Sequence, residues 1–273
     1  MTPPELDVLV PTRNRPVELA TTLAGLAAQD SPFGVVVSDQ SDGPPGYATP
    51  PARTLLRVLR AAGHPVRVGR HLPPRGLAEH RAALLARSRA RYVLFCDDDV
   101  WLAPGTVARL HTAIRELGCG FVGAAVQALS YVEEVREDEL APFERWRTRP
   151  VPEQVTKDST AWGRWTLHNA ANPLHLTERH VRPGECYVPY KIAWVGGCVL
   201  YDRRALQAVG GFGFWRELPA SHCGEDVVVQ QRVMARFGAA GILPSGAYHL
   251  ESPTTVPDRT VDAVDRLGAG SPP

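Results

Sequence analysis

Cysteine is scarce in this chain and never has the spacing of a metal or redox motif. The 273 residues include five cysteines, an odd number, and no CxxC pair. Neither a disulfide framework nor a zinc site is therefore expected, and a reducing compartment is favoured. The sequence also lacks an apolar run of transmembrane length, and its N-terminus lacks the apolar region of a signal peptide. We expect a cytoplasmic protein without a transmembrane segment, and peripheral contact with a membrane stays open.

An excess of charge of either sign is absent as well. The chain carries 30 lysine and arginine residues against 29 aspartate and glutamate residues, a net charge of +1. The composition therefore gives no reason to expect nucleic acid as a partner. Two nucleotide-binding motifs are also missing. No GxGxxG follows the first predicted strand and no GxxxxGK[ST] occurs, which excludes a dinucleotide fingerprint and a P-loop.

The first half of the sequence does contain a regular alternation of short apolar runs and amphipathic segments. The length allows one large α/β domain or two small ones. The periodicity predicts strands over 6–10, 34–38, 66–68 and 92–96, and helices over 16–27, 54–62 and 76–90. This order predicts an α/β fold in which ligands bind outside the carboxyl ends of the strands.

The fourth apolar run ends in three consecutive carboxylates. Residues 91–101 read RYVLFCDDDVW, which places Asp97, Asp98 and Asp99 at the end of a strand. Three carboxylates there repel one another, and a hard divalent cation such as Mg²⁺ or Mn²⁺ would offset this repulsion. Strand alternation sends Asp97 and Asp99 to one side and Asp98 to the other. The alternative is a solvated acidic turn that caps the helix expected after Pro104.

The second half is less regular. Its pattern predicts strands over 121–128, 193–200 and 242–248, and helices over 104–117, 203–209 and 227–237. Residues 131–149 carry many charges, and residues 161–190 show little periodicity and several aromatic side chains. Such a segment in a compact domain is usually functional or disordered, and the aromatics argue against disorder, so we predict a substrate-facing surface. From Ser252 the chain is rich in proline, glycine and charge, and we expect it to be loosely held.

Other polar residues follow predicted strands or begin a helix. Residues 12–15 follow the first strand, Asp39 ends the second and His249 follows the last. Glu225 and Asp226 stand at the start of a helix, where a carboxylate normally acts as a cap, but capping explains one acid better than two. A lone histidine is more often structural than a ligand, so both readings of His249 remain open.

Glycine and tryptophan are the remaining candidates in the second half. Gly196 and Gly197 lie in the run AWVGGCVL, where glycine marks either the approach of a ligand or close packing. Tryptophan side chains can stack on a sugar ring, an aglycone or a lipid-linked acceptor. The tryptophans in this half that we consider for such a surface are Trp162, Trp165, Trp194 and Trp215.

Five segments together resemble the GT-A glycosyltransferases of the large inverting family 2. They are VLVPTRNRP (8–16), VVVSDQSDG (35–43), YVLFCDDDVWLAPGTV (92–107), GGCVLYDRRALQAVGGF (196–212) and GEDVVVQQRV (224–233). Each segment alone is weak evidence, but five segments in the order of the family are strong evidence. Together they cover roughly residues 5–250. The resemblance implies an α/β GT-A fold, in which a Rossmann-like nucleotide-binding half with a mixed central sheet flanked by helices is fused to an acceptor-binding half.

The resemblance also implies an activity and a set of roles. The enzyme would move one sugar, with inversion, from a nucleoside-diphosphate donor to an acceptor hydroxyl, and UDP is the favoured nucleotide. Asp226 would be the general base and Glu225 would orient the acceptor. Mn²⁺ or Mg²⁺ on Asp99, Asp97 and His249 would neutralise the leaving diphosphate. The donor would contact Pro11, Thr12, Arg13, Arg15, Asp39, Arg81, Asp97, Asp98, Gly196 and Gly197, and the acceptor, a sugar, natural product or lipid-linked molecule, would contact Trp162, Trp165, Trp194 and Trp215.

The sequence departs from the family pattern in two places. The family usually has Asp-Asp-Gly-Ser after its second strand, whereas residues 39–43 read DQSDG. The QXXRW motif of processive members is missing, which disfavours a polymer synthase and favours a single addition. Two alternatives stay open. One is a nucleotidylyltransferase acting on sugar phosphates, although residues 10–16, VPTRNRP, lack the glycine of its phosphate loop; the other is a non-catalytic nucleotide-sugar-binding protein.

The expected domain organisation follows from these segments. We expect one GT-A domain over residues 1–251. Its nucleotide-sugar-binding half would comprise residues 1–120, and its acceptor-binding half residues 121–251. Residues 252–273 would form a C-terminal tail.

Overall fold

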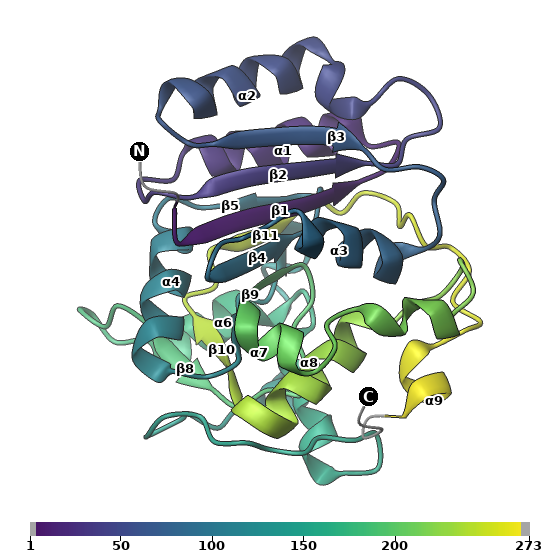
Figure 1. The fold of residues 1–273 in the computed structure, drawn as a ribbon. Helices are drawn as coiled ribbons and strands as arrows, with labels where there is room; N and C mark the ends of the chain where they lie inside the picture. The colour runs from purple at the N-terminus through teal and green to yellow at the C-terminus, as the bar shows by residue number, and fades with distance from the viewer. Residues whose placement is uncertain (1–3, 269–273) are drawn as a thin grey trace.

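The first half of the chain forms the parallel part of a mixed sheet, as predicted (Figure 1). A computed structural model describes residues 4–268. Strands β1 (Leu6–Thr12), β2 (Gly34–Asp39), β3 (Val66–Arg70) and β4 (Tyr92–Cys96) run parallel in the order β3-β2-β1-β4. The connecting segments are α1 (Pro16–Ala27), the 3-10 turn η1 (Gly46–Ala48), α2 (Pro50–Ala61) and α3 (Leu77–Ala86). The carboxyl ends of these strands therefore meet at one edge of the sheet.

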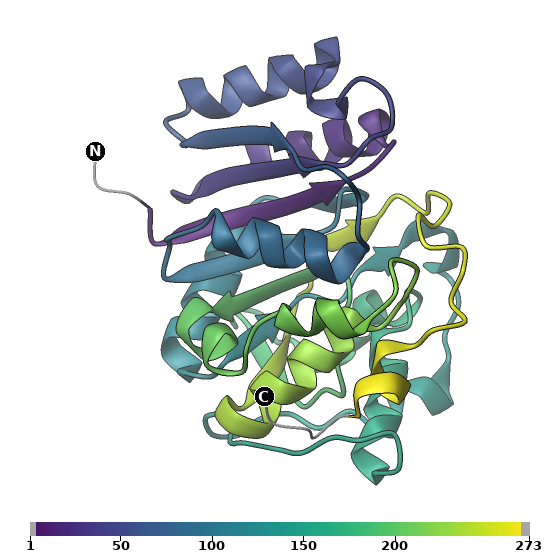
Figure 2. The ribbon, with the colours of Figure 1, turned by 45° about the vertical axis from the view of Figure 1, so that its right-hand side comes forward.

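The second half of the chain extends the same sheet to eight strands. Strand β9 (Cys198–Asp202) inserts antiparallel between β4 and β6 (Phe121–Gly123), and β10 (Ala239–Leu243) and β8 (Val188–Tyr190) complete the order. The helices of this half are α4 (Thr106–Leu117), α5 (Glu137–Leu140), α6 (Asn172–His180), α7 (Arg203–Ala208), α8 (Glu225–Phe237) and α9 (Ala263–Leu267), with 3-10 turns η2 (Leu129–Tyr131), η3 (Thr160–His168) and η4 (Gly213–Glu217). The mixed central sheet flanked by helices is the predicted architecture (Figure 2).

A second, three-stranded sheet includes the strand that directly follows the aspartate triplet. Strand β11 (Ala247–His249) pairs antiparallel with β5 (Val100–Leu102) and parallel with β7 (Gln127–Ala128). The single strand predicted over 242–248 is wrong, because Pro244 and Gly246, which has a φ of 69°, separate β10 from β11. In the register of this sheet His249 lies opposite Val100, which places it beside the aspartate triplet.

Two hydrophobic cores cover the two faces of the large sheet. Side chains alternate along β1, so that Val8 and Val10 pack toward α1, α2 and α4, while Leu9 packs toward α3, α7 and α8. All three side chains are fully buried. The strand β4 contributes to both cores in the same way, and this fixes the position of the aspartates that follow it.

Three local expectations need correction. The strand predicted over 193–200 begins only at Cys198, so the glycine pair precedes it. The segment 161–190 is not without regular structure, because it contains most of η3 together with α6 and β8. The segment after Ser252 was expected to be loosely held, but α9 packs on α8 and Ala263 is fully buried. Within residues 4–268, no helix is both long and apolar enough to cross a membrane.

Candidate active site

The aspartate triplet at the end of β4 lies among basic side chains that come from other elements. Arg15, just before α1, contacts Asp98 at 3.1 Å and Asp99 at 2.6 Å. Burial disfavours the charge of Arg15, but the two carboxylates outweigh this effect and its pKa is raised. The repulsion among the carboxylates is therefore offset partly by arginine, which the local sequence around the triplet does not show.

Asp98 points into the protein. Its carboxylate accepts a hydrogen bond from the Thr12 hydroxyl at 2.7 Å, and its backbone carbonyl accepts one from the Thr22 hydroxyl at 2.7 Å. Burial raises the pKa of Asp98 to about 7. Asp98 and Thr12 were predicted to contact the donor, whereas their side chains here bind each other and join the end of β1 to the end of β4.

Asp99 and His249 form the centre of the predicted metal site. The imidazole Nε2 of His249 lies 3.4 Å from the Asp99 carboxylate, and the backbone N–H of Leu250 donates to the Asp99 carbonyl at 2.9 Å. Asp97 instead points toward Arg81. Over the described range 4–268, no cluster of three or more histidine, cysteine, aspartate or glutamate side chains is arranged to hold a metal. The two groups suit Mg²⁺ or Mn²⁺ when water and substrate phosphates supply the other oxygens, which is the usual arrangement for Mg²⁺.

Arg81 on α3 connects the aspartate triplet with the start of α8. Its guanidinium contacts Asp97 at 2.9 Å and Glu225 at 3.1 Å, and its side chain is only 7% exposed. Burial disfavours the charge, but both carboxylates outweigh it and the pKa of Arg81 is raised. Arg81 was predicted to contact the nucleotide, and in this structure it holds two carboxylates from the two halves of the chain.

Glu225 and Asp226 are the first two residues of α8. The N-cap is Gly224, with a φ of 76° and no side chain to cap the helix. Burial raises the pKa of Glu225, which is bound to Arg81. Burial and the neighbouring Glu225 carboxylate raise the pKa of Asp226 to about 6. Glu225 is therefore held by an ion pair, and Asp226 is the carboxylate of the two that has no side-chain partner among the described residues.

Asp39 is fully buried at the end of β2. Its two carboxylate oxygens accept hydrogen bonds from the backbone N–H groups of Ser41 at 2.6 Å and Gly46 at 2.7 Å. Beside it, Arg13 contacts the exposed Asp42 at 3.1 Å. Asp39 therefore shapes the loop at this edge of the sheet, and contact with a nucleobase would require the loop to move.

The glycine pair packs against the acidic strand end. The backbone N–H of Asp97 donates to the Gly197 carbonyl at 2.9 Å. Gly197 has a φ of 78°, and a Cβ atom there would lie 2.7 Å from a methyl group of Val126. Close packing thus accounts for Gly197. A Cβ atom at Gly196 would meet no atom closer than one of the Trp194 ring, at 3.6 Å, which is an ordinary van der Waals distance.

The four tryptophans come from three parts of the second half of the chain. Trp162 and Trp165 both lie on η3, Trp194 precedes β9 and Trp215 lies on η4. Trp162, Trp194 and Trp215 pack half-buried against the core on the α8 side of the sheet, and Trp165 is 41% exposed. Their predicted contact with an acceptor stays a prediction.

Sequence reasoning missed the segment that follows β11. Arg15 donates to the Pro253 carbonyl, and the Ser252 hydroxyl lies 3.0 Å from Glu18 on α1. Glu251 accepts from Ser130 at 3.0 Å. This segment, residues 250–253, lies against the arginine that binds Asp98 and Asp99. The composition of this segment resembles that of a flexible tail. Only its position directly after His249 could have indicated that it lies at the site.

Comparisons with known proteins agree with this fold. The sequence profile of the family described as Glycosyl transferase family 2 matches residues 7–172. The solved structure of S. aureus TarS 1–349 has a TM-score of 0.54 at 16% identity, covering 89% of this chain and 60% of that one. The same fragment in complex with UDP-GlcNAc has a TM-score of 0.53 at 17% identity, covering 92% and 60%.

A third solved structure is the mannosyltransferase PcManGT from Pyrobaculum calidifontis in complex with GDP-Man and Mn²⁺. It has a TM-score of 0.50 at 16% identity and covers 88% of this chain and 57% of that one. The chain thus spans about three fifths of the length of the TarS fragment. None of the curated protein sequences matches this chain significantly. At these identities the structural similarity shows the GT-A fold.

Proposed function

The chain belongs to glycosyl transferase family 2, and from this premise we propose that it is an inverting enzyme that moves one sugar from a nucleoside-diphosphate donor, favouring UDP, to an acceptor hydroxyl. Membership of this family removes the nucleotidylyltransferase alternative. The observation that carries the proposal is the position of Asp226. It is a carboxylate with a raised pKa at the start of α8, beside the ion pairs that join Glu225, Arg81 and Asp97.

Asp226 suits the role of general base. A base must be within reach of the acceptor proton and have a pKa near the working pH. The pKa of Asp226 is raised to about 6, so the side chain is ionised at neutral pH and still basic enough to accept a proton. A single base that deprotonates the acceptor hydroxyl leads to direct displacement and inversion at the anomeric carbon. Glu225, held by Arg81, would orient Asp226 and the acceptor.

The donor would bind at the carboxyl edge of the parallel strands. We assign the diphosphate to the region of Asp99 and His249, where a divalent metal would neutralise the charge of the leaving group. Arg15 already contacts Asp98 and Asp99, and it would lie next to the diphosphate. PcManGT in complex with GDP-Man and Mn²⁺ and TarS in complex with UDP-GlcNAc support this assignment by analogy. The nucleobase would lie near the loop that Asp39 shapes.

We also propose the division of the chain into two functional halves. Residues 1–120 contribute Arg15, Asp39 and the aspartate triplet to the donor side. Residues 121–251 contribute Glu225 and Asp226 to the acceptor side and His249 to the metal. The described part of the segment after residue 251 lies against Arg15 and α8, so it belongs to the same structural unit.

The test is an assay of the chain with a panel of nucleoside-diphosphate sugars, with Mn²⁺ or with EDTA. Donor binding is read by thermal shift, because a ligand of the native state raises its apparent stability. Turnover is read as release of the nucleoside diphosphate. Metal-dependent binding and turnover are expected for at least one UDP-sugar. Binding without any turnover, across acceptors that include sugars and lipid-linked sugars, would instead support the non-catalytic nucleotide-sugar-binding protein.

A further inference from the structure

The net charge of +1 conceals a strong separation of charge along the chain. Between Gly43 and Cys96 the sequence contains ten arginines and one acidic residue, Glu79. Since the whole chain has 30 basic and 29 acidic residues, the other segments together carry 20 basic and 28 acidic residues. The positive charge is thus concentrated in α2, β3, α3 and the segments that join them.

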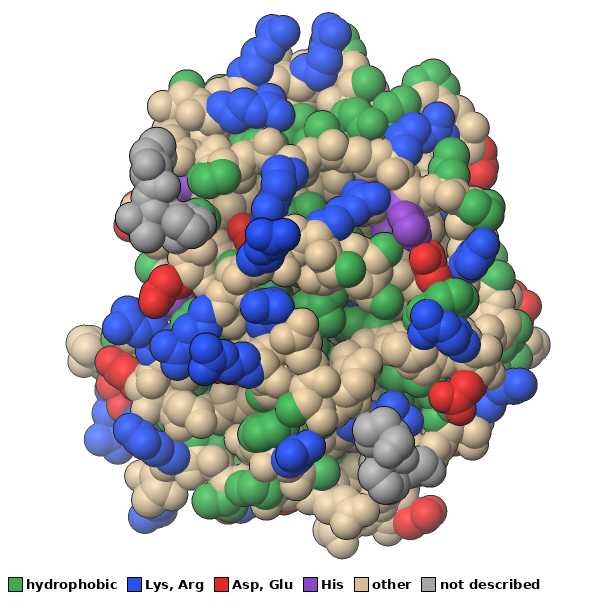
Figure 3. All heavy atoms as spheres, viewed as in Figure 1, with side chains coloured by type: hydrophobic (Ala, Val, Ile, Leu, Met, Phe, Trp, Pro, Cys, Tyr) green, Lys and Arg blue, Asp and Glu red, His purple; other side chains and the backbone are tan. Residues whose placement is uncertain are grey.

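Much of this charge lies on one exposed surface at the β3 edge of the sheet. Arg53, Arg57 and Arg60 follow one flank of α2 at helical spacing, and Arg70 lies on the edge strand β3; we call these four residues the basic face. All four are exposed, and Figure 3 shows blue side chains projecting from this end of the molecule. Arg67, also on β3, points to the other face of the sheet, where it contacts Asp7 at 2.7 Å. Across residues 4–268, no carboxylate lies within ion-pair distance of the three α2 arginines.

Exposed aliphatic side chains lie near these arginines. Val68 on β3 is 36% exposed and Leu72 just after β3 is 49% exposed. Val58, which is 45% exposed, lies on the other flank of α2, the flank that carries Pro51. Arginine next to exposed aliphatic side chains is typical of surfaces that bind the interface of an anionic bilayer.

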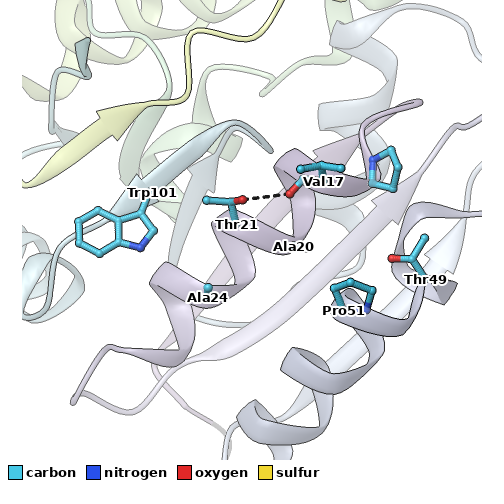
Figure 4. A pocket seen from close by; sticks show the side chains of 8 residues that line it. Val17, Ala20, Thr21, Ala24, Thr49, Pro51 and Trp101 are labelled. Carbon is cyan, nitrogen blue, oxygen red and sulfur yellow. Dashed lines mark hydrogen bonds between the residues drawn. The ribbon is translucent and has the colours of Figure 1, made fainter. Parts of the chain in front are cut away.

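The other flank of α2 borders an apolar groove. The groove, of about 440 Å³, is lined by Pro16, Val17, Ala20, Thr21, Ala24, Thr49, Pro51 and Trp101, without a charged side chain. In Figure 4 the α1 residues lie between Trp101 on one side and Thr49 and Pro51 on the other. Val17 at its margin is 73% exposed. Tryptophan is enriched at membrane interfaces, so Trp101 suits a groove that faces lipid.

We propose that the basic face and the adjoining apolar groove form a docking surface for an anionic phospholipid bilayer. The arginines bind lipid phosphates, Val58, Val68 and Leu72 enter the interface, and the groove between α1 and α2 receives part of an acyl chain. Nucleic acid fits this surface less well, because residues 50–91 contain no phenylalanine, tyrosine or tryptophan on which a base could stack. The inference rests on charge and exposed apolar surface and does not require the proposed glycosyl transfer.

The surface adjoins the candidate active site. Pro16, at one end of the groove, directly follows Arg15, and Trp101 is part of the strand that follows the aspartate triplet. A bilayer on this surface would therefore bring lipid next to the donor side of the proposed site. This position suits an enzyme whose acceptor is presented at a membrane.

Cosedimentation of the full chain with vesicles tests the proposal. We expect binding to vesicles of phosphatidylcholine with phosphatidylglycerol and none to vesicles of phosphatidylcholine alone. Salt should weaken the binding, because it screens exposed charges. The triple variant Arg53→Gln/Arg57→Gln/Arg60→Gln is expected to bind the anionic vesicles at least about tenfold more weakly than the original chain. Val17→Glu is expected to weaken binding without a change in the number of arginines.

Two matched controls make the outcome decisive. Arg147→Gln/Arg149→Gln/Arg204→Gln removes the same charge from exposed positions outside this surface, and Val151→Glu places the same carboxylate at a valine that is 56% exposed elsewhere. Both controls are expected to bind like the original chain. Equal loss in the two triple variants would overturn the proposal, as would binding to neutral vesicles. Binding of duplex RNA in the absence of any vesicle binding would also overturn it and would identify a polyanion surface.

Discussion

Asp97 and Glu225 share one cation. The guanidinium of Arg81 lies 2.9 Å from the first carboxylate and 3.1 Å from the second. Asp97 follows β4, in the proposed donor half, and Glu225 begins α8, in the proposed acceptor half. Arg81 therefore joins the two proposed halves at the site itself, in addition to the backbone pairing of β4 with β9.

Replacing Arg81 by methionine is expected to destabilise the protein and to reduce transfer. The buried Glu225 and the Asp97 carboxylate, which is 34% exposed, would lose their cation. Removal of one partner from a buried ion pair costs about 3–5 kcal/mol, and the exposure of Asp97 places the expected loss of unfolding free energy in urea at the lower end of this range. Arg67→Met is the control, since the Arg67 side chain is 52% exposed and water screens its ion pair with Asp7, so the expected loss is about 1 kcal/mol. An equal effect of the two variants would contradict the bridging role.

Asp226→Asn is expected to abolish transfer and to leave nucleotide binding intact. Loss of a general base typically costs about 100-fold to 10,000-fold in rate. The measurements are turnover with a donor sugar and the Kd for the nucleoside diphosphate. Asp265→Asn is the matched control, because the Asp265 side chain is 65% exposed on α9 and contacts Lys157 away from the site. Turnover near that of the control would exclude Asp226 as the base.

The pH dependence of kcat/KM should follow the titration of Asp226. The pKa of Asp226 is raised to about 6 by burial and by Glu225. A general base works only when deprotonated, so activity is expected to rise with pH through this value and to fall tenfold per pH unit below it. A profile of kcat/KM between pH 4.5 and 8.5, with stability checked at each pH, measures this. A flat profile across pH 6 would assign the base elsewhere.

Replacement of His249 by alanine is expected to weaken metal-dependent donor binding. The side chain is one of two groups, with Asp99, that would hold the metal. The apparent Kd for Mn²⁺ in the presence of UDP should rise about tenfold or more, because changes even to residues that only orient metal ligands cost that much. Asp99→Asn should act in the same direction. His111→Ala, on α4, is the control, and unchanged Mn²⁺ affinity in both site variants would remove them from the metal site.

His168 should make the protein less stable in acid. Burial lowers its pKa to about 3, well below the value of an unfolded histidine. Between about pH 3 and pH 6.5 the unfolded chain binds a proton that the folded chain does not, so stability is lost as the pH falls, by up to about 1.4 kcal/mol per pH unit. His168→Phe is expected to flatten this loss by the contribution of one histidine. Tyr190→Phe removes a buried hydroxyl nearby without a group that titrates in this range, so it should keep the original slope.

The parts of the fold that sequence predicted are those with a strong local pattern. Strands β1 to β4 and helices α1 to α3 have apolar residues at the expected spacing over five or more residues, and all of them form, although α2 begins four residues before its predicted start and α3 ends four residues before its predicted end. Strands β5, β7, β8 and β11 are two or three residues long. Pairing with strands distant in the sequence makes these segments extended, and no local pattern records that pairing.

The candidate site, too, has a part that the sequence predicted and a part that it did not. The sequence identified the carboxylates, because Asp97 to Asp99 and Glu225-Asp226 stand at the ends of recognisable elements. It did not show their partners. Arg15 contacts Asp99 across 84 positions of sequence, and Arg81 reaches Glu225 from another helix. Such pairs depend on how helices pack on the sheet, which single-sequence patterns do not encode.

The small sheet that brings β11 beside β5 has a consequence for the order in which the protein is made. His249 and the Arg15 partner Pro253 leave the ribosome after every strand of the large sheet. A chain whose synthesis stops before residue 247 would contain Asp97 to Asp99, Glu225 and Asp226 but would lack β11 and His249. The chain thus gains its proposed activity only when the last strand arrives.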